Sequence, residues 1–366
     1  MPTPTRVVVV PPRPGPLEIQ ELTLPDPGPH QVVVRLLSSG VCHSQLHQMH
    51  APRRNPVVLG HEATGTVLAK GGRVKHLREG DTAIVTWVPR NAPRTKRRAE
   101  PATLRLADGS EALSQNVFTW ADHTLADEQF VVKVPDSIQK DVTAIIGCAV
   151  ITGAGAVKNT AAVRRGESVA VFGVGGVGLC AIAAARQAGA SPIIAVDLAD
   201  DKLDFAERFG ATHKVNAARG DAVQAIRDLT TREGAGWDIL GRPLTGVDYA
   251  FDCIGLKITM EQIVAAARSG HFGAREGGTA VLVGVPGTKP EINALDLLVH
   301  EKRFIGSIGG SCHPDRDFPT FLEWHQKGIL DLGALVTARY RLDQINEATH
   351  ALESGQIFGR AILELV

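Results

Sequence analysis

In the first part of the chain, apolar residues come in short runs separated by glycine, proline and aspartate. Four of these runs are rich in valine and of strand length, at 6–10, 31–36, 64–69 and 82–87. Short β-branched runs bounded by turn residues are typical of strands. The pattern therefore predicts a β-rich region over the first ~150 residues, and the run 360–365 predicts a closing strand.

From about residue 149 the pattern changes to alternating strands and helices. The first pair is a buried strand at 168–172 and, after a glycine-rich turn, an alanine-rich helix that ends near Ala188. Further elements are predicted, as strands at 192–196, 247–253 and 279–283 and as helices at 202–209 and 221–229. Strands that alternate with helices indicate a parallel sheet.

Length and charge narrow the class of protein. The chain has 366 residues, enough for about two domains, and its 39 basic and 39 acidic residues cancel. This balance favours neither a nucleic acid nor a membrane surface as partner. No apolar run approaches the ~18 residues of a membrane span, and the first residues lack a secretory signal pattern.

The five cysteines are few, odd in number and far apart, which does not suggest a disulfide framework. They are Cys42, Cys148, Cys180, Cys253 and Cys312. Isolated cysteines of this kind are expected in a reducing compartment. We therefore predict a cytoplasmic protein whose cysteines are core residues or metal ligands.

The turn GVGGVG at 173–178 follows a predicted strand and opens a predicted helix. An acid, Asp197, ends the next strand 19 residues after Gly178. This is the context of the dinucleotide-binding fingerprint, in which glycines let the backbone approach a pyrophosphate at a helix N-terminus. A carboxylate at Asp197 favours NAD over NADP because it repels a 2′-phosphate. The alternative is an ordinary glycine turn.

Three glycine-containing segments each offer one possible zinc ligand, a cysteine or a histidine. They are GVCHS at 40–44, GHE at 60–62 and GC at 147–148. Together, Cys42, His61 and Cys148 make a Cys₂His set with a fourth position open for substrate. Taken singly, each is more often a core residue than a ligand. Spacing alone does not join residue 42 to residue 148.

The chain resembles the medium-chain zinc alcohol dehydrogenases over nearly its whole length. Besides the three segments above, the resemblance is carried by VFGVGGVG at 171–178, Asp197 with Lys202, VGV at 283–285 and the segment around Arg360. Within that family it is most similar to the class III-like, mycothiol-dependent formaldehyde dehydrogenases. DFPTFLEW at 317–324 and GATHKVNA at 210–217 carry this finer likeness.

The resemblance implies an α/β protein of two domains. A GroES-like, β-rich catalytic domain would comprise 1–149 and 309–366. A Rossmann domain with a doubly wound parallel sheet would comprise 150–308. Relatives form dimers or tetramers, and we expect a homodimer, with a tetramer as the alternative.

The resemblance also implies the residues of a catalytic site. Cys42, His61 and Cys148 match the ligands of one catalytic zinc. Glu62 matches a carboxylate beside the metal that assists ligand exchange, and Ser44 and His47 match a relay that carries the substrate proton to solvent. Trp87 falls where relatives place a bulky residue of the substrate pocket. The residues that match cofactor contacts are His43, Thr152, Gly173, Gly175, Gly176, Val177, Gly178, Asp197, Lys202, Val283, Val285 and Arg360.

The chain departs from its relatives at two places. No cysteine lies between Cys42 and Cys148, so the usual lobe of four cysteines for a structural zinc is missing. Its place is taken by the basic segment 90–100, which we interpret as a solvated loop, with an anion-binding surface as the alternative. Gln45 stands where many relatives have an aspartate that supports the histidine ligand, and its amide oxygen can accept the same bond.

These features predict a zinc-dependent enzyme that transfers a hydride between NAD(H) and a primary alcohol or aldehyde. Three other enzymes remain open: an S-(hydroxymethyl)thiol dehydrogenase of the mycothiol type, an aldehyde reductase of specialised metabolism, and a nicotinoprotein that retains its cofactor. A non-catalytic binding protein on a dehydrogenase scaffold is the alternative outside enzymes. The expected partner is a small-molecule alcohol or aldehyde.

Overall fold

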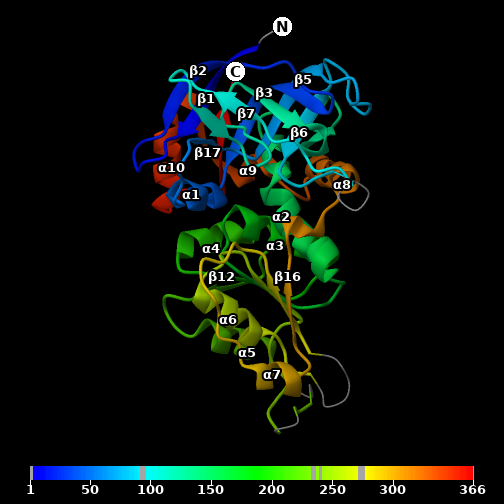
Figure 1. Ribbon diagram of the computed structural model, residues 1–366. Helices are drawn as coiled ribbons and strands as arrows, with labels where there is room; N and C mark the ends of the chain where they lie inside the picture. Colours follow the sequence, from blue (N-terminus) through cyan, green and yellow to red (C-terminus); the bar gives the residue numbers. More distant parts are fainter. Residues whose placement is uncertain (1–2, 91–95, 232–235, 239–240, 271–276, 366) are drawn as a thin grey trace. The chain divides into compact units, whose positions relative to one another are not determined.

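The computed structural model describes residues 3–365 except 91–95, 232–235, 239–240 and 271–276. The chain divides into two compact units, which are described separately (Figure 1). Unit 1 contains 1–149 and 313–366, and unit 2 contains 150–312. The second division lies after Cys312, four residues beyond the boundary expected from the sequence.

Unit 1 is built from two sheets with the strand orders β2-β1-β4-β8-β7 and β10-β6-β5-β3-β18-β17, and β9 also pairs with β3. Its strands are β1 (Thr3–Val10), β2 (Glu18–Leu24), β3 (Gln31–Val41), β4 (Val57–Val58), β5 (Glu62–Lys70), β6 (Thr82–Thr86), β7 (Thr103–Arg105), β8 (Glu111–Leu113), β9 (His123–Asp127), β10 (Val131–Lys133), β17 (Val336–Arg341) and β18 (Arg360–Glu364). The β-rich prediction for this region is confirmed.

Short helices connect the strands of unit 1. They are α1 (His43–His50), η1 (Glu128–Phe130), η2 (Thr143–Gly147), α8 (Pro314–Gln326), α9 (Leu332–Leu335), η5 (Leu342–Gln344) and α10 (Ile345–Glu353). The second sheet has a fully apolar layer, in which Val34 of β3, Val67 of β5 and Val85 of β6 belong to one buried cluster. Burial of such side chains is the main stabilising contribution to a sheet of this kind.

Unit 2 is a six-stranded sheet with the order β13-β12-β11-β14-β15-β16, and every adjacent pair is parallel. Its strands are β11 (Val169–Phe172), β12 (Ile193–Asp197), β13 (His213–Asn216), β14 (Tyr249–Asp252), β15 (Thr279–Leu282) and β16 (Arg303–Gly306). Numbered along the chain, the order is 3-2-1-4-5-6. This is the doubly wound order of dinucleotide-binding sheets, as predicted.

The helices of unit 2 connect these parallel strands. They are α3 (Gly176–Ala188), α4 (Asp200–Glu207), α5 (Ala222–Thr230), α6 (Lys257–Ala266) and α7 (Ala294–Val299), with α2 (Ala149–Gly155), η3 (Ala156–Ala161) and η4 (Gly309–Ser311) near the ends of the unit. In the described part of the chain, no helix is long and apolar enough to span a bilayer.

Candidate metal centre and cofactor-binding loop

Four ligand-bearing side chains of unit 1 converge on one point. Ligand atoms of Cys42, His61, Glu62 and Cys148 all lie within 4.8 Å of one another. The sulfurs of Cys42 and Cys148 are 4.0 Å apart. Two thiolates on one tetrahedral zinc, with Zn–S bonds of about 2.3 Å, lie about 3.8 Å apart. The sulfur spacing therefore suits a shared metal ion.

Cys42 follows β3 and stands at the N-cap of α1. Its backbone N–H donates to Oε1 of Gln45 at 2.9 Å, and the Gln45 side chain is fully buried. The amide oxygen that we expected to support His61 thus has a different donor, the backbone of Cys42. Gln45 fixes the backbone of one ligand residue.

His61 stands directly before β5, after a glycine that the local backbone requires. Gly60 has φ +95°, and a Cβ added there would lie 2.5 Å from the backbone nitrogen of Trp120. Nε2 of His61 is buried without a hydrogen-bond partner among the described residues. A buried, unpaired imidazole nitrogen is costly, and coordination of a metal ion would remove that cost.

Cys148 follows η2, which packs against β5 and β6. The hydroxyl of Thr86 donates to the backbone oxygen of Gly147 at 2.6 Å and so holds the residue before the ligand. Thr86 is also the register partner of Glu62 in the β5–β6 pair. The next residue, Trp87, meets the His61 ring edge-on, with ring centroids 6.4 Å apart. Sequence reasoning missed the role of Thr86.

Glu62 and Arg360 form a buried ion pair beside the sulfurs. Both Nε and Nη2 of Arg360 donate to Oε1 of Glu62, the first at 3.1 Å, and both side chains are essentially inaccessible to water. Oε2 of Glu62 accepts a long bond from the N–H of Ala149 at 3.4 Å. Burial raises the pKa of Glu62, and Arg360 opposes this effect. Sequence reasoning assigned Arg360 to the cofactor and missed this pairing.

The two thiols titrate as a coupled pair. The hydrogen bond from Cys148 lowers the pKa of Cys42 well below its ordinary value, and the positive charge of Arg360 acts in the same direction. The same bond, together with burial, raises the pKa of Cys148. One thiolate therefore forms readily, and a bound dication would favour loss of the second proton.

The glycine turn of unit 2 connects β11 to α3. A Cβ added at Gly178 would lie 1.9 Å from the backbone oxygen of Gly173, so only glycine allows this close approach. Gly175 is the N-cap of α3. The turn thus presents the positive end of a helix dipole and backbone N–H groups, as the fingerprint requires.

Asp197 ends β12 beside this turn. Its Oδ2 accepts the N–H of Val174 at 3.0 Å, and its Oδ1 accepts the N–H of Leu198 at 2.8 Å. The carboxylate is therefore held against the glycine turn. Lys202 follows in α4 and is half-buried. The acid that the sequence singled out lies at the carboxyl end of a strand, where ligands bind in such sheets.

Other predicted cofactor residues of unit 2 approach the same turn. A Cβ on Gly153, next to Thr152, would lie 2.0 Å from the backbone oxygen of Val177, so α2 packs closely on α3. The hydroxyl of Thr152 is buried without a partner among the described residues. Ile254, which sequence reasoning missed, lies within van der Waals range of Gly173 and is 40% exposed.

Val283 and Val285 follow β15. Val283 is almost fully buried, whereas Val285 is 55% exposed, and its backbone oxygen closely approaches Gly255. His43 is exposed at the start of α1 in unit 1.

Comparisons with known proteins cover both units. A family profile described as a GroES-like alcohol dehydrogenase domain matches residues 28–136, and one described as a zinc-binding dehydrogenase matches 176–327. The S-(hydroxymethyl)glutathione dehydrogenase of Escherichia coli is 33% identical over 93% of this chain and 94% of its own length. This chain belongs to the medium-chain zinc-dependent alcohol dehydrogenase family.

Other alcohol dehydrogenases also match this chain over nearly its whole length. Putative alcohol dehydrogenase D of Mycobacterium tuberculosis is 30% identical over 93% of this chain and 94% of its own length. The structure of a zinc-binding-domain alcohol dehydrogenase from Burkholderia ambifaria has a TM-score of 0.87 and 32% identity. Benzyl alcohol dehydrogenase from Acinetobacter calcoaceticus has a TM-score of 0.85 and 28% identity. Both structures cover all of this chain, and this chain covers all of each.

The residues of the metal centre fit the zinc that this dehydrogenase family implies. Two sulfurs and one imidazole nitrogen form a donor set of the kind zinc prefers, and the unpaired His61 Nε2 supplies a ready lone pair. Ser44 lies beside the centre, because its hydroxyl donates to Sγ of Cys42 at 3.3 Å. His47 follows one helical turn later on α1 and is exposed.

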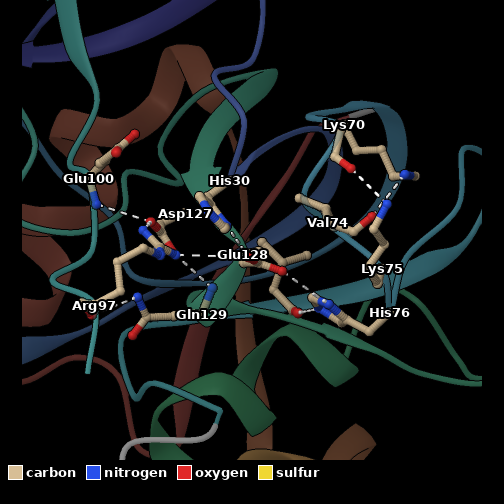
Figure 2. A network of polar contacts seen from close by, with 12 residues as sticks. His30, Lys70, Val74, Lys75, His76, Arg97, Glu100, Asp127, Glu128 and Gln129 are labelled. Carbon is tan, nitrogen blue, oxygen red and sulfur yellow. Dashed lines mark hydrogen bonds and ion pairs between the residues drawn. The ribbon is translucent and has the colours of Figure 1, made fainter. Parts of the chain in front are cut away.

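Two cations of the basic segment 90–100, Arg90 and Arg97, are less exposed to solvent than we expected. The interpretation as a solvated loop is wrong for Arg90, which forms an ion pair with Asp315, and for Arg97, which forms an ion pair with Asp127 (Figure 2). Lys96 and Arg98 are exposed, and Arg94 lies outside the described residues. No described contact supports an anion-binding surface here.

Proposed function

We propose that this chain is an NAD-dependent dehydrogenase that oxidises a primary alcohol to an aldehyde, and catalyses the reverse reduction, at a single catalytic zinc. The observation that carries this proposal is the convergence of Cys42, His61 and Cys148, with Nε2 of His61 buried and unpaired. A donor set of three with a fourth position open is the arrangement of a catalytic rather than a structural zinc. The alternative of a non-catalytic binding protein does not account for it.

In this proposal Cys42, His61 and Cys148 hold the zinc. The ion supplies a Lewis acid that lowers the pKa of the alcohol hydroxyl. The chain's own residues set the charge around it: two thiolates, and the Glu62–Arg360 pair, whose charges cancel. Glu62 lies close enough to the ligand atoms to assist exchange at the open position.

We assign proton removal to Ser44 and His47. The hydroxyl of Ser44 lies at the metal centre, and His47 is on the same face of α1, three residues later, with its ring in contact with solvent. The Ser44 hydroxyl accepts the substrate proton as it releases its own, and His47 delivers the released proton to water. A relay of this kind is general acid–base catalysis by positioned groups.

A nicotinamide cofactor, when bound, would supply the acceptor for the hydride. The glycine turn at 173–178 binds its pyrophosphate, and Asp197 accepts hydrogen bonds from the adenosine ribose and excludes a 2′-phosphate. Lys202, His43, Thr152, Val177, Val283, Val285 and Arg360 complete the proposed cofactor contacts.

Three further proposals concern the whole protein. The absence of cysteine from 43–147 supports one zinc per chain, without a structural zinc.

β16 is an edge strand of its sheet, and Leu295 and Leu298 on α7 are 64% and 75% exposed. This exposed apolar edge supports a homodimer through unit 2. The five free thiols support a reducing, cytoplasmic location.

We also propose a division of the chain into two domains. The GroES-like domain comprises 1–149 and the C-terminal residues from about 309, and the Rossmann domain comprises the residues between them. The two family profiles, which begin at residues 28 and 176, support this order.

The experiment that tests the proposed function is NADH formation by the purified protein across a panel of alcohols, with and without a chelator. We expect turnover of at least one simple primary alcohol, lost on chelation and lost in Cys148→Ser. Asp315→Asn, a surface variant, serves as the matched control. Chelator-insensitive turnover, or turnover retained in Cys148→Ser, would contradict the proposal.

A second candidate function is supported by the relatives. Several of them are named S-(hydroxymethyl)glutathione dehydrogenase, with 33% identity to this chain. The same panel should therefore contain adducts of formaldehyde with glutathione and with mycothiol. Turnover of an adduct alone would assign the chain to this thiol-dependent activity.

A further inference from the structure

A cluster of charged residues lies where Arg97 and Glu100 of the basic segment meet η1. The guanidinium of Arg97 donates to both carboxylate oxygens of Asp127, at 2.6 and 2.8 Å (Figure 2). Asp127 is fully buried, and 30% of the Arg97 side chain is exposed. A two-pronged bond between guanidinium and carboxylate fixes both groups in one geometry.

Backbone bonds to the same place fix the rest of the segment. Asp127 also accepts the N–H of Glu100 and the N–H of Gln129, each at 3.0 Å. Gln129 accepts the N–H of Arg90 at 2.7 Å, and its side-chain amide donates to the backbone oxygen of Arg97 at 3.3 Å. Residues 90, 97 and 100 are therefore all tied to the same turn of chain.

Glu128 connects this cluster to the neighbouring elements. Its carboxylate lies 2.5 Å from Nδ1 of His30, 3.6 Å from Nδ1 of His76 and 3.9 Å from Nη2 of Arg97. The segment is thus connected through Glu128 to the start of β3 and to the loop before β6. Arg90 is paired separately with Asp315 of α8.

The cluster does not resemble a metal site. Among the described residues, the four-residue group around Cys42 and Cys148 is the one set of ligand atoms close enough together to hold an ion. Cysteine is absent from 43–147. The carboxylate oxygens of Asp127 that would face a cation already face the guanidinium of Arg97.

We propose that Arg97, Asp127 and Gln129 form a metal-free clasp that holds Arg90 and residues 97–100 against η1. The buried charge of Asp127 makes the clasp all-or-none, because opening it leaves an ionised carboxylate without its counter-charge in the interior. Gln129 contacts both sides of the clasp, because its backbone oxygen accepts the N–H of Arg90 and its side-chain amide donates to the backbone oxygen of Arg97. This inference does not depend on the proposed enzymatic activity.

The test is limited proteolysis with trypsin, with cleavage positions identified by mass spectrometry. The segment carries cleavage sites after residues 90, 94, 96, 97 and 98. Arg97→Gln and Arg98→Gln each remove one site, but only Arg97 belongs to the clasp, so Arg98→Gln is the matched control. We expect cleavage between 90 and 98 to be at least tenfold faster in Arg97→Gln than in Arg98→Gln. Equal rates would overturn the clasp.

Two further measurements distinguish the clasp from general unfolding of the variant and from a bound metal ion. If Arg97→Gln is cleaved throughout the chain, the double variant Arg97→Gln/Asp127→Asn, which has no unpaired buried charge, replaces it. Fast cleavage confined to 90–98 in that variant supports the clasp, and cleavage at the wild-type rate overturns it. Addition of a chelator to the wild type should leave cleavage at 90–98 unchanged. A tenfold acceleration confined to those positions would show that a metal ion holds the segment, and would overturn the proposal.

Discussion

Single residues of the metal centre depend on partners that are far away in the sequence. Glu62 and Arg360 are 298 positions apart, yet each satisfies the other's buried charge. Gln45 fixes Cys42, and Thr86 fixes the residue before Cys148. Two of the three ligand residues, Cys42 and Cys148, therefore lie in backbone segments that hydrogen bonds hold in place without a metal ion.

Glu62→Gln should destabilise unit 1, because it removes the carboxylate charge that pairs with the buried guanidinium of Arg360. We expect the free energy of unfolding in urea to fall by about 3–5 kcal/mol. The control is Glu364→Gln, on the same strand as Arg360. It breaks an exposed pair with Arg339 and should lower the free energy of unfolding by no more than about 1 kcal/mol. Equal losses in the two variants would show that the buried pair has no special role.

Asp197→Asn should weaken the preference for NAD over NADP, because it removes the negative charge that faces a 2′-phosphate. We expect the ratio of kcat/KM values for the two cofactors to fall by about tenfold, equal to about 1.4 kcal/mol. Asp200→Asn, an exposed acid on the next helix that is paired with Arg219, is the control. An unchanged ratio in Asp197→Asn would remove Asp197 from the ribose site.

At the scale of secondary-structure elements, the sequence predicted the strands and helices that carry a clear local pattern of apolar residues. The buried strand before the glycine turn was predicted within one residue of β11, and the predicted end of the following helix, Ala188, is the last residue of α3. β13 and β16 were missed, because HKVN and RFIG are short and mix charged with apolar residues. Edge strands of a sheet are half exposed, and so they lack the continuous apolar run of a central strand.

The sequence predicted the metal ligands of the candidate site because each lies in a short glycine-containing segment. It did not predict the residues that pair around them. Contacts between distant strands, such as β18 with β3, bring Arg360 to Glu62, and no local pattern encodes that pairing. The clasp was missed for the same reason. Nothing in the sequence around Arg97 indicates that Asp127 will be buried opposite it.

Gly60→Ala should disturb the entry to β5 and with it the position of His61. The φ of +95° is strained for alanine, and the added Cβ would clash with the backbone of Trp120. We expect a loss of about 1–3 kcal/mol in stability and a lower zinc content per chain. Gly72→Ala, where a Cβ has open space, is the control. Full zinc content in Gly60→Ala would show that this backbone is not critical.

At the scale of the whole molecule, the clasp makes stability depend on pH. Burial opposes ionisation of Asp127, but Arg97 and the N–H groups of Gln129 and Glu100 outweigh it and hold its pKa below the usual range. A carboxyl with a lowered folded pKa contributes stability above its unfolded pKa of about 3.9, and the contribution is lost as pH falls through the folded pKa.

We therefore expect Asp127→Asn to be less stable than the wild type near pH 7, and the difference to shrink as the pH falls below about 4. Urea unfolding at a series of pH values from 7 to 3 measures both. The same series on Glu79→Gln, an exposed acid in a turn, provides the control. A difference between wild type and Asp127→Asn that stays constant or grows on acidification would contradict the assignment.

The central claim is that one zinc ion per chain binds at Cys42, His61 and Cys148. The most direct measurement is zinc content by mass spectrometry of the purified wild type and of Cys148→Ser, after dialysis against metal-free buffer. We predict about one zinc per chain in the wild type, since Cys₂His offers one such site, and a large loss in the variant. Two zinc ions per wild-type chain, or undiminished zinc in Cys148→Ser, would contradict the account.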